Sequence, residues 1–331
     1  MKSPFTLWRF SMLKKSFWLL FFLLLILSPF IGAVNISLAE LIQGSTLSSQ
    51  IFFELRLPRV LYAFSAGSIL ALSGLLFQTL FRNPLMTPYT LGISSGATLG
   101  AGIAIKLGLA SLLFGIGAIT LFGFMGAMLT IFLLIYLSGY LQGSQQSSLL
   151  LLGIALSLFY TSALMVVFYL GDSVQNDMLI RFTMGSLSVI GWQSPIVLSS
   201  IALLLVLGIY LYRFDLQLLG VSQESAALKG VNSKKVTFIL LSLSSLAIGI
   251  LVSISGPIGF VGLVAPHIIT KLYPLTIEKR IIKTALFGGF FLLLCDTITR
   301  ALPSQSELPI GIVTALIGAP FFIYLIITRM R

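Results

Sequence analysis

The chain has 331 residues, of which 57% are hydrophobic and 9% are charged, and its mean hydropathy is +1.08. This composition excludes an ordinary soluble domain and indicates a polytopic membrane protein. A net charge of +11 suggests nucleic-acid binding in a soluble protein, but in a membrane protein it first reflects basic cytoplasmic loops, so no nucleic-acid partner is predicted. One cysteine and one histidine exclude an intramolecular disulfide and a multi-histidine metal site, and we predict no cofactor.

Hydrophobic runs separated by polar breaks predict an all-α fold with about ten helices that span a lipid bilayer. No linker or low-complexity tract marks a boundary, so residues 1–331 are expected to form a single transmembrane domain. The predicted spans lie near 16–34, 58–81, 88–106, 112–137, 148–170, 192–212, 236–254, 258–273, 281–300 and 310–328.

Ten crossings place both termini on one side of the membrane, and the distribution of positive charge indicates which side this is. Only five of the 20 positive residues fall on the side opposite to the termini. Because cytoplasmic loops collect Lys and Arg, both termini are predicted to be cytoplasmic. The five exceptions are Arg56, Arg59, Lys106, Arg181 and Arg300.

The second predicted span carries a polar stripe. Residues 60–81 contain no charge and, at about 1.5 Å per residue, cover roughly 33 Å as a helix. Small and polar residues, including Ser65, Gly74 and Gln78, recur within it at helical spacing. Because an amide without a partner is costly in lipid, Gln78 is expected to face protein or a pore.

The sizeable loop on the predicted inner side spans about 213–235. Asp215 and Ser222 are predicted to be N-caps of two short helices at right angles to the spans, and Gly230 suits the end of the second helix. Two interpretations stay open for this loop. It is either a basic, solvated connector or a docking surface for another protein.

The segment 92–96 matches the G-x-S-x-G pattern of hydrolases. However, no strand precedes it, and the chain's single histidine lies in another span. Gly92, Gly96 and Gly100, spaced four residues apart, more simply predict a close approach of two membrane helices.

The segment 255–267 is crowded with helix breakers. Gly256, Pro257 and Pro266 predict a bent backbone, a structural hinge whose freed carbonyls are satisfied by neighbouring groups or a cavity. His267 follows directly. A lone histidine at such a place is more typical of hydrogen-bonded structure than of a ligand or a proton carrier.

Asp296 and Arg300 lie one helical turn apart near the predicted outer end of the ninth span. Pairing between them is the simplest interpretation. Arg300 shares the outer side with Arg56 and Arg59, which also suggests a cluster that receives carboxylates of a partner. Glu307 is an alternative, internal partner for one of these arginines.

The sequence contains no G-x-x-x-x-G-K-[ST] phosphate loop, so it cannot hydrolyse ATP by that route, and we predict that it is not an enzyme. It also lacks the buried acidic and basic relays of a proton-coupled carrier. If the protein is a pump, its energy must come from another subunit. The alternative is an ion-coupled secondary transporter or channel that works without an ATPase partner.

Six sequence pieces in fixed order together resemble the permeases of ABC importers for iron-siderophores, haem and cobalamin, and the resemblance covers nearly the whole chain. The pieces are 56–59, Gln78 with 82–85, 88–97, 184–187, 256–267, and 296–300 followed by 307–311. The resemblance implies a type II ABC importer permease with ten spans. It also implies a homodimer in the bacterial inner membrane, two cytoplasmic ATPase subunits, an external substrate-binding protein and transport by alternating access.

The resemblance also implies roles for residues at both ends of the molecule. Arg56, Arg59 and Arg300 look like arginines that dock the binding protein, and 171–186 would hold a short outer helix. At the inner end, 213–235 resembles the coupling helices that contact the ATPase, although Lys229 replaces the family's usual apolar residue. The implied coupling residues are Ser222, Gln223, Glu224, Ala226, Ala227, Lys229 and Gly230.

The polar loop 138–148 resembles the cytoplasmic gate region of these permeases. The residues implied in the gate and the pathway are Gln78, Asn83, Leu85, Gly143, Ser144 and Ser147. For Gln78 the resemblance leaves two positions open, the transport pathway and the dimer interface.

Overall fold

The computed structural model describes residues 20–32, 34, 41, 46–109, 112–113, 116–138, 145–272, 276–302 and 307–329. The predicted gate residues Gly143 and Ser144 lie outside these ranges, whereas Ser147 is in the first turn of α7. The helices are a first apolar helix Leu20–Phe30, α3 (Thr46–Gln50), α4 (Leu57–Leu80), α5 (Ile93–Lys106), α6 (Ala118–Ser138), α7 (Gln145–Leu170), α8 (Ser173–Met184), α9 (Gln193–Leu211), α10 (Arg213–Val221), α11 (Gln223–Leu228), α12 (Ser233–Ser255), α13 (Val261–Leu272), α14 (Ile277–Ala301) and α15 (Ile310–Arg329).

The all-α prediction is confirmed, and each of the ten predicted spans contains a helix. Within the described residues, five helical segments are long and apolar enough to cross a membrane on their own: Leu47–Leu80, Ser148–Leu170, Gln193–Leu211, Ser233–Ser255 and Ile277–Ala301. Four more apolar helices are shorter: Leu20–Phe30, Ala118–Leu134, Val261–Leu272 and Ile310–Tyr324.

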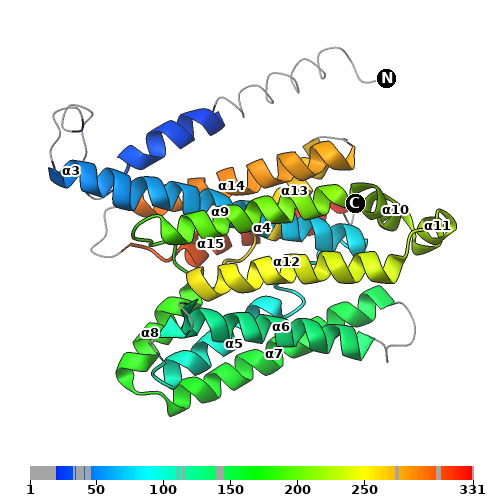
Figure 1. Cartoon of the computed structure of the whole chain (residues 1–331), viewed down its shortest axis with the longest axis horizontal. Helices are drawn as coiled ribbons and strands as arrows, with labels where there is room; N and C mark the ends of the chain where they lie inside the picture. Colours follow the sequence, from blue (N-terminus) through cyan, green and yellow to red (C-terminus); the bar gives the residue numbers. More distant parts are fainter. Residues whose placement is uncertain are drawn as a thin grey trace.

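The helices form two groups, with α4 at the centre of one and α12 between the two (Figure 1). Helix α4 packs against α9, α13 and α14, and 89% of the most apolar stretch within Leu47–Leu80 is buried. Helix α12 contacts α4 and α9 on one side and α5 and α6 on the other, and α7 packs against α5. The small residues of the polar stripe predicted for α4 therefore face neighbouring helices, not lipid.

The two ends of the bundle differ. The short helices α10 and α11 lie at one end, beyond the ends of α9 and α12, and α8 lies at the opposite end (Figure 1). We call these the α10–α11 end and the α8 end. Helices α4 and α14 run antiparallel, so Arg59 and Arg300 meet at the α8 end, and the C-terminus of α4 meets the N-terminus of α14 at the α10–α11 end.

The predicted starts of the third and fourth spans were wrong. Helix α5 begins at Ile93 and not near 88, because two prolines precede it and Gly92 adopts a left-handed conformation with φ of 78°. Helix α6 begins at Ala118 and not near 112, because Leu112–Leu113 (β1) pairs antiparallel with Ile116–Gly117 (β2). The shorter α5, at about 1.5 Å per residue, covers roughly 21 Å, less than a bilayer's hydrocarbon thickness.

The second span begins earlier than predicted. Helix α3, a π-helical turn at Ile51–Arg56 and α4 form one continuous helical segment. Pro58 lacks a backbone N–H and crowds the carbonyl four residues before it, and the π-turn precedes it directly. The sequence prediction placed the start near 58 because the run without charged residues begins just after Arg59.

The close helix approach predicted from the G-x-x-x-G spacing is confirmed between α5 and α6. A Cβ atom on Gly96 would lie 2.0 Å from Thr130 Oγ1, and a Cβ on Gly126 would lie 2.1 Å from the Gly96 carbonyl oxygen. The segment 92–96 is thus a helix start packed against a neighbour. This geometry fits the packing interpretation and places no strand before Ser94.

Candidate functional site

Gln78 connects α4 to α13 at the α10–α11 end. Its side-chain amide donates a hydrogen bond to the Gly262 carbonyl oxygen at 3.1 Å. In a regular helix this carbonyl would accept from the N–H four residues later, but that residue is Pro266, which has none. Gln78 therefore satisfies the carbonyl that the proline frees, as the helix-breaker pattern predicted in general terms.

The contact depends on close packing of the two backbones. A Cβ atom on Gly74 would lie 1.8 Å from the Gly262 carbonyl oxygen, so only glycine fits at this position of α4. Gln78 lies one turn further along the same face. The α4–α13 contact is thus specified by Gly74, Gln78 and Gly262 together with Pro266.

A double-mutant cycle tests this contact. Gln78→Leu should lower stability by about 1–3 kcal/mol, because it leaves a buried carbonyl unsatisfied. Pro266→Ala supplies the missing backbone N–H, so the same leucine substitution should cost clearly less in that background. Thermal unfolding in detergent of the four proteins measures the coupling; an equal cost in both backgrounds would contradict the assignment.

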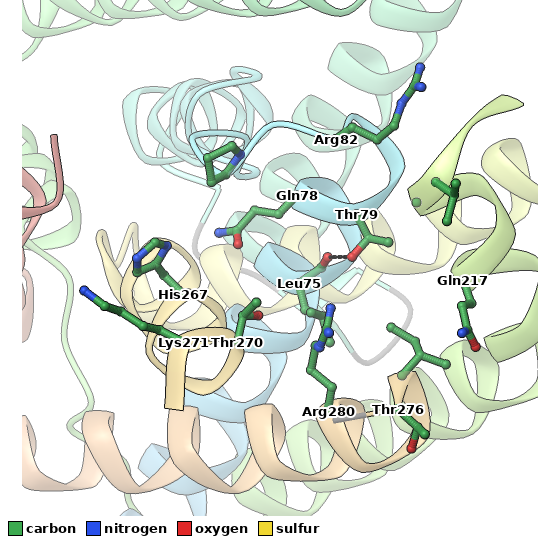
Figure 2. A pocket seen from close by; sticks show the side chains of 14 residues that line it. Leu75, Gln78, Thr79, Arg82, Gln217, His267, Thr270, Lys271, Thr276 and Arg280 are labelled. Atoms are coloured by element: carbon green, nitrogen blue, oxygen red, sulfur yellow. Dashed lines mark hydrogen bonds between the residues drawn. The ribbon is translucent and has the colours of Figure 1, made fainter. Parts of the chain in front are cut away.

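A cavity of about 600 Å³ opens beside Gln78 at the α10–α11 end (Figure 2). It lies where α4 and α13 end and where α14 begins, and α10 closes one side. His267, predicted to be structural, lines this cavity and has an edge-to-face contact with Phe321 at 6.3 Å between ring centroids. The lining residues are Leu75, Gln78, Thr79, Arg82, Pro84, Gln217, Gly220, Val221, His267, Thr270, Lys271, Thr276, Ile277 and Arg280.

The loop after α4 forms a tight turn at the cavity's edge. Arg82 has a positive φ of 49°, and the Asn83 side chain accepts a hydrogen bond from the Leu85 backbone N–H at 3.0 Å. Asn83 and Leu85, predicted to be gate residues, are not among the cavity-lining residues, whereas Arg82 and Pro84 are. Their predicted role in a gate stays a prediction.

The segment 213–235 forms the two short helices that the sequence predicted. Ser222 is the N-cap of α11 and accepts a hydrogen bond from the Ser225 backbone N–H at 2.9 Å, and Gly230 follows the helix with φ of 80°. The N-cap prediction for Asp215 was wrong: α10 begins at Arg213, so Asp215 lies in its first turn. Tertiary packing of Leu216 and Leu219, both buried, sets the position of α10.

Helix α11 has one buried face and one exposed face. Ala226 is fully buried, whereas Ala227 and Lys229 are exposed. Leu228 is 90% exposed, which is unusual for a leucine next to a packed helix. Gln223 and Glu224 are also exposed. An apolar tip on a short projecting helix is the kind of feature that fits into a groove of another protein.

At the α8 end, two of the three predicted docking arginines bind the end of the first helix. Arg56 Nη1 donates to the Pro29 and Phe30 carbonyl oxygens, each at 3.0 Å, and Arg300 Nη1 donates to Ser28 and Ile31, each at 3.0 Å. Both arginines are only 7% exposed. The last carbonyls of a helix lack intrahelical partners and carry partial negative charge, which guanidinium groups satisfy well.

The third arginine bridges two carboxylates. Arg59 lies 2.9 Å from Asp296 Oδ1 and 2.7 Å from Glu307 Oε2, and Arg300 Nε lies 3.0 Å from Asp296 Oδ2. The predicted pairs of Arg300 with Asp296 and of an arginine with Glu307 are therefore both present. Asp296 is 1% exposed, whereas the Glu307 side chain is 51% exposed. In this conformation the three guanidinium groups are engaged within the chain.

The predicted hinge joins α12 to α13. Gly256, with φ of 69°, ends α12, and four residues without helical structure or with a bend precede Val261. A Cβ on Gly256 would lie 2.1 Å from the Phe182 carbonyl oxygen, and one on Gly311 would lie 2.4 Å from that of Met184. Three sequence pieces that are distant along the chain thus meet at the end of α8.

Sequence reasoning missed the cavity, because its walls come from four separate segments. Lys271 and Arg280 were treated as loop charges that orient the chain, yet both line the cavity.

Outside the spans, α8 carries one exposed ion pair, in which Arg181 donates to Asp177 at 2.9 Å. Asp177 raises the pKa of the Arg181 guanidinium. The exposed tip of α11 had a sequence signal, since Leu228 breaks an otherwise polar and small-residue helix.

These features define a class: a polytopic helical membrane protein with short helices projecting at one end and helix breaks beside a cavity. The chain belongs to the FecCD transport family, whose model matches residues 19–328. It is 37% identical to the hemin transport system permease protein HmuU of Yersinia pestis, with 90% of each chain covered. It is 33% identical to the vitamin B12 import system permease protein BtuC of Salmonella paratyphi A, over 95% of this chain and 96% of the relative.

A solved structure agrees with this assignment. An inward-facing conformation of a metal-chelate type ABC transporter matches 93% of this chain and 97% of the solved chain, with 30% identity and a TM-score of 0.81. The similarity therefore extends through both groups of helices. The chain is accordingly a transporter component of the permease type.

Proposed function

We propose that the protein is the membrane permease of an ABC importer that moves a metal chelate, such as haem, an iron-siderophore or cobalamin, into the cytoplasm by alternating access. The single observation that carries this proposal is the full-length similarity to a metal-chelate type ABC transporter and to hemin and vitamin B12 permeases. The projecting α10–α11 segment, with its apolar tip, supports an ATPase partner on the same side.

In this proposal two copies of the chain form the transport unit in the bacterial inner membrane, and two ATPase subunits bind at the α10–α11 end. Both termini are cytoplasmic, because most of the positive residues then lie on the inner side. The α8 end is external and receives the substrate-binding protein. The break at Gly256 and the α4–α13 contact at Gln78 are the places where small rearrangements of the bundle would be accommodated.

The complex of permease, ATPase and binding protein provides the test of this function. Hydrolysis of ATP by the reconstituted complex should rise when the binding protein carries its chelate. Permease that copurifies with no ATPase subunit, or an ATPase activity that ignores the binding protein, would contradict the proposal. Hemin, a ferric siderophore and cobalamin, offered in turn, identify the substrate.

Docking of the binding protein is expected to involve Arg59, the arginine of the three that is bound to an exposed carboxylate, Glu307. A carboxylate of the partner can replace Glu307 without leaving a buried charge unpaired. Arg59→Gln should therefore weaken binding of the binding protein by about 10-fold, a loss typical of a removed hydrogen-bonded charge.

Arg213→Gln is the matched control for Arg59→Gln. It also removes one ion pair, that with Glu278 at 2.9 Å, but at the opposite end. Affinity for the binding protein, measured on permease in lipid discs, should change for the Arg59 variant alone. Unchanged affinity in both variants would rule out Arg59 as a docking residue.

A further inference from the structure

The cavity at the α10–α11 end is strongly basic. Arg82, Lys271 and Arg280 line it together with His267, and none of the lining residues in the described part of the chain is acidic. The nearest acidic residue along α14, Glu278, is engaged with Arg213 at 2.9 Å. Three cationic side chains thus line one hollow, and the described part of its wall contributes no carboxylate.

Further features of the cavity favour an anion. The N-terminus of α14 reaches it through Thr276 and Ile277, and no side chain caps this helix, so its positive end is directed there. Figure 2 shows the Arg280 side chain extending from α14 toward Leu75, whereas the Arg82 and Lys271 side chains extend outward at two different edges of the cavity. The hydroxyl groups of Thr270 and Thr276 add neutral hydrogen-bond donors at the wall.

The depth of the cavity indicates which anion it would meet. Its walls are the last turns of α4 and α13 and the first turn of α14, so it lies where membrane helices end. This is the level at which a bilayer places its phosphate groups, and basic pockets between membrane helices on the cytoplasmic side suit anionic headgroups. Lys271 also lies over the ring of Tyr324, at 5.9 Å from its centroid, and Tyr residues favour this interfacial level.

We propose that this cavity is a binding site for a phosphate-bearing anion, namely the headgroup of an anionic lipid such as phosphatidylglycerol. A volume of about 600 Å³ is in the range of small-ligand sites and holds a headgroup. In this proposal Arg280 contacts the phosphate from inside, and the exposed side chains of Arg82 and Lys271 turn inward from the edge to reach it. That this lipid belongs to the cytoplasmic leaflet rests on the proposed function, because the orientation proposed there places the α10–α11 end in the cytoplasm.

A headgroup in this site would link lipid to the transport machinery. The wall includes Gln217, Gly220 and Val221 of α10, which leads directly into α11, and Gln78, which bonds the break in α13. A bound anion would therefore contact both the segment proposed to bind the ATPase and the α4–α13 contact at which the bundle is proposed to rearrange.

The experiment uses the purified full-length permease alone, so failure of transport does not affect it. Native mass spectrometry follows the binding of phosphatidylglycerol and, in parallel, phosphatidylcholine. The double variant R82Q/K271Q, at the exposed edge, should bind phosphatidylglycerol roughly 30-fold more weakly, since each cation near the surface contributes about a factor of five. R280Q provides a second variant from inside the cavity.

Lys279→Gln is the matched control, because Lys279 is exposed and adjacent to Arg280 but does not line the cavity. It should bind phosphatidylglycerol within a factor of two of the unmodified protein. If millimolar inorganic phosphate displaced phosphatidylglycerol, the cavity would still be a phosphate-binding site, but its ligand would be a soluble anion and not a lipid. Equal binding of both lipids, or equal losses in the control and the cavity variants, would overturn the proposal.

Discussion

Replacing Asp296 by alanine should destabilise the protein by about 3–5 kcal/mol, because it leaves the buried Arg300 and the partly buried Arg59 without their shared carboxylate. Asp296 is 1% exposed and lies 2.9 Å from Arg59 and 3.0 Å from Arg300. Arg300 also holds the end of the first helix through the Ser28 and Ile31 carbonyls. Loss of Asp296 should therefore release the first helix as well as weaken the α4–α14 contact.

Thermal unfolding of the detergent-solubilised permease measures this effect, with Asp177→Ala as the matched control. Asp177 is also paired with an arginine four residues away, but both side chains are largely exposed. Surface ion pairs contribute little, so the control should unfold close to the unmodified protein. A similar loss for the two variants would show that burial of Asp296 is not what makes its ion pairs important.

Ala227→Arg and Leu228→Asp should each uncouple ATP hydrolysis from the binding protein, with stimulation falling about 10-fold or more, the typical effect of losing an interface hot spot. Ala227 is exposed and Leu228 is 90% exposed, so neither substitution disturbs the interior of the permease. Both place a charge on the apolar tip of α11. The ATPase activity of the reconstituted complex, with and without loaded binding protein, measures the coupling.

Lys279→Gln, on the exposed start of α14 and outside the segment 213–235, is the control for these variants and should retain stimulation. Ala226→Arg is a contrasting variant, because Ala226 is fully buried and its replacement should reduce the amount of folded protein. Stimulated hydrolysis at the unmodified level in both Ala227→Arg and Leu228→Asp would remove α11 from the coupling interface.

Sequence reasoning identified the spans well, since an uninterrupted apolar run of about 20 residues is typical of a helix that crosses a membrane. The predicted helix boundaries were wrong where the local backbone conformation, and not hydropathy, sets the start of a helix. Helix α5 begins later than predicted because Gly92 adopts a left-handed conformation, and α6 begins later because a short strand pair precedes it. The second helical segment begins earlier, at Thr46, because a π-turn joins α3 to α4 before Pro58. Hydropathy is insensitive to such details.

The sequence predicted the site residues whose role depends on local backbone conformation, but not the contacts between distant segments. Ser222 and Gly230 act through local backbone geometry, so the sequence alone identified them. The partner of Gln78 depends on a proline 188 positions away, and nothing in the local pattern indicates it. Arg56, Arg59 and Arg300 lie together as predicted, but the burial of Arg56 and Arg300 against the first helix depends on packing among three separate helices.

Uptake into proteoliposomes tests the central claim most directly. Permease, ATPase and binding protein are reconstituted together, and accumulation of labelled hemin, ferric siderophore or cobalamin is followed with and without ATP on the ATPase side. We predict accumulation of one chelate that requires ATP and the binding protein and persists when ion gradients are collapsed. Accumulation that follows an ion gradient and ignores ATP would contradict this account and support a secondary transporter.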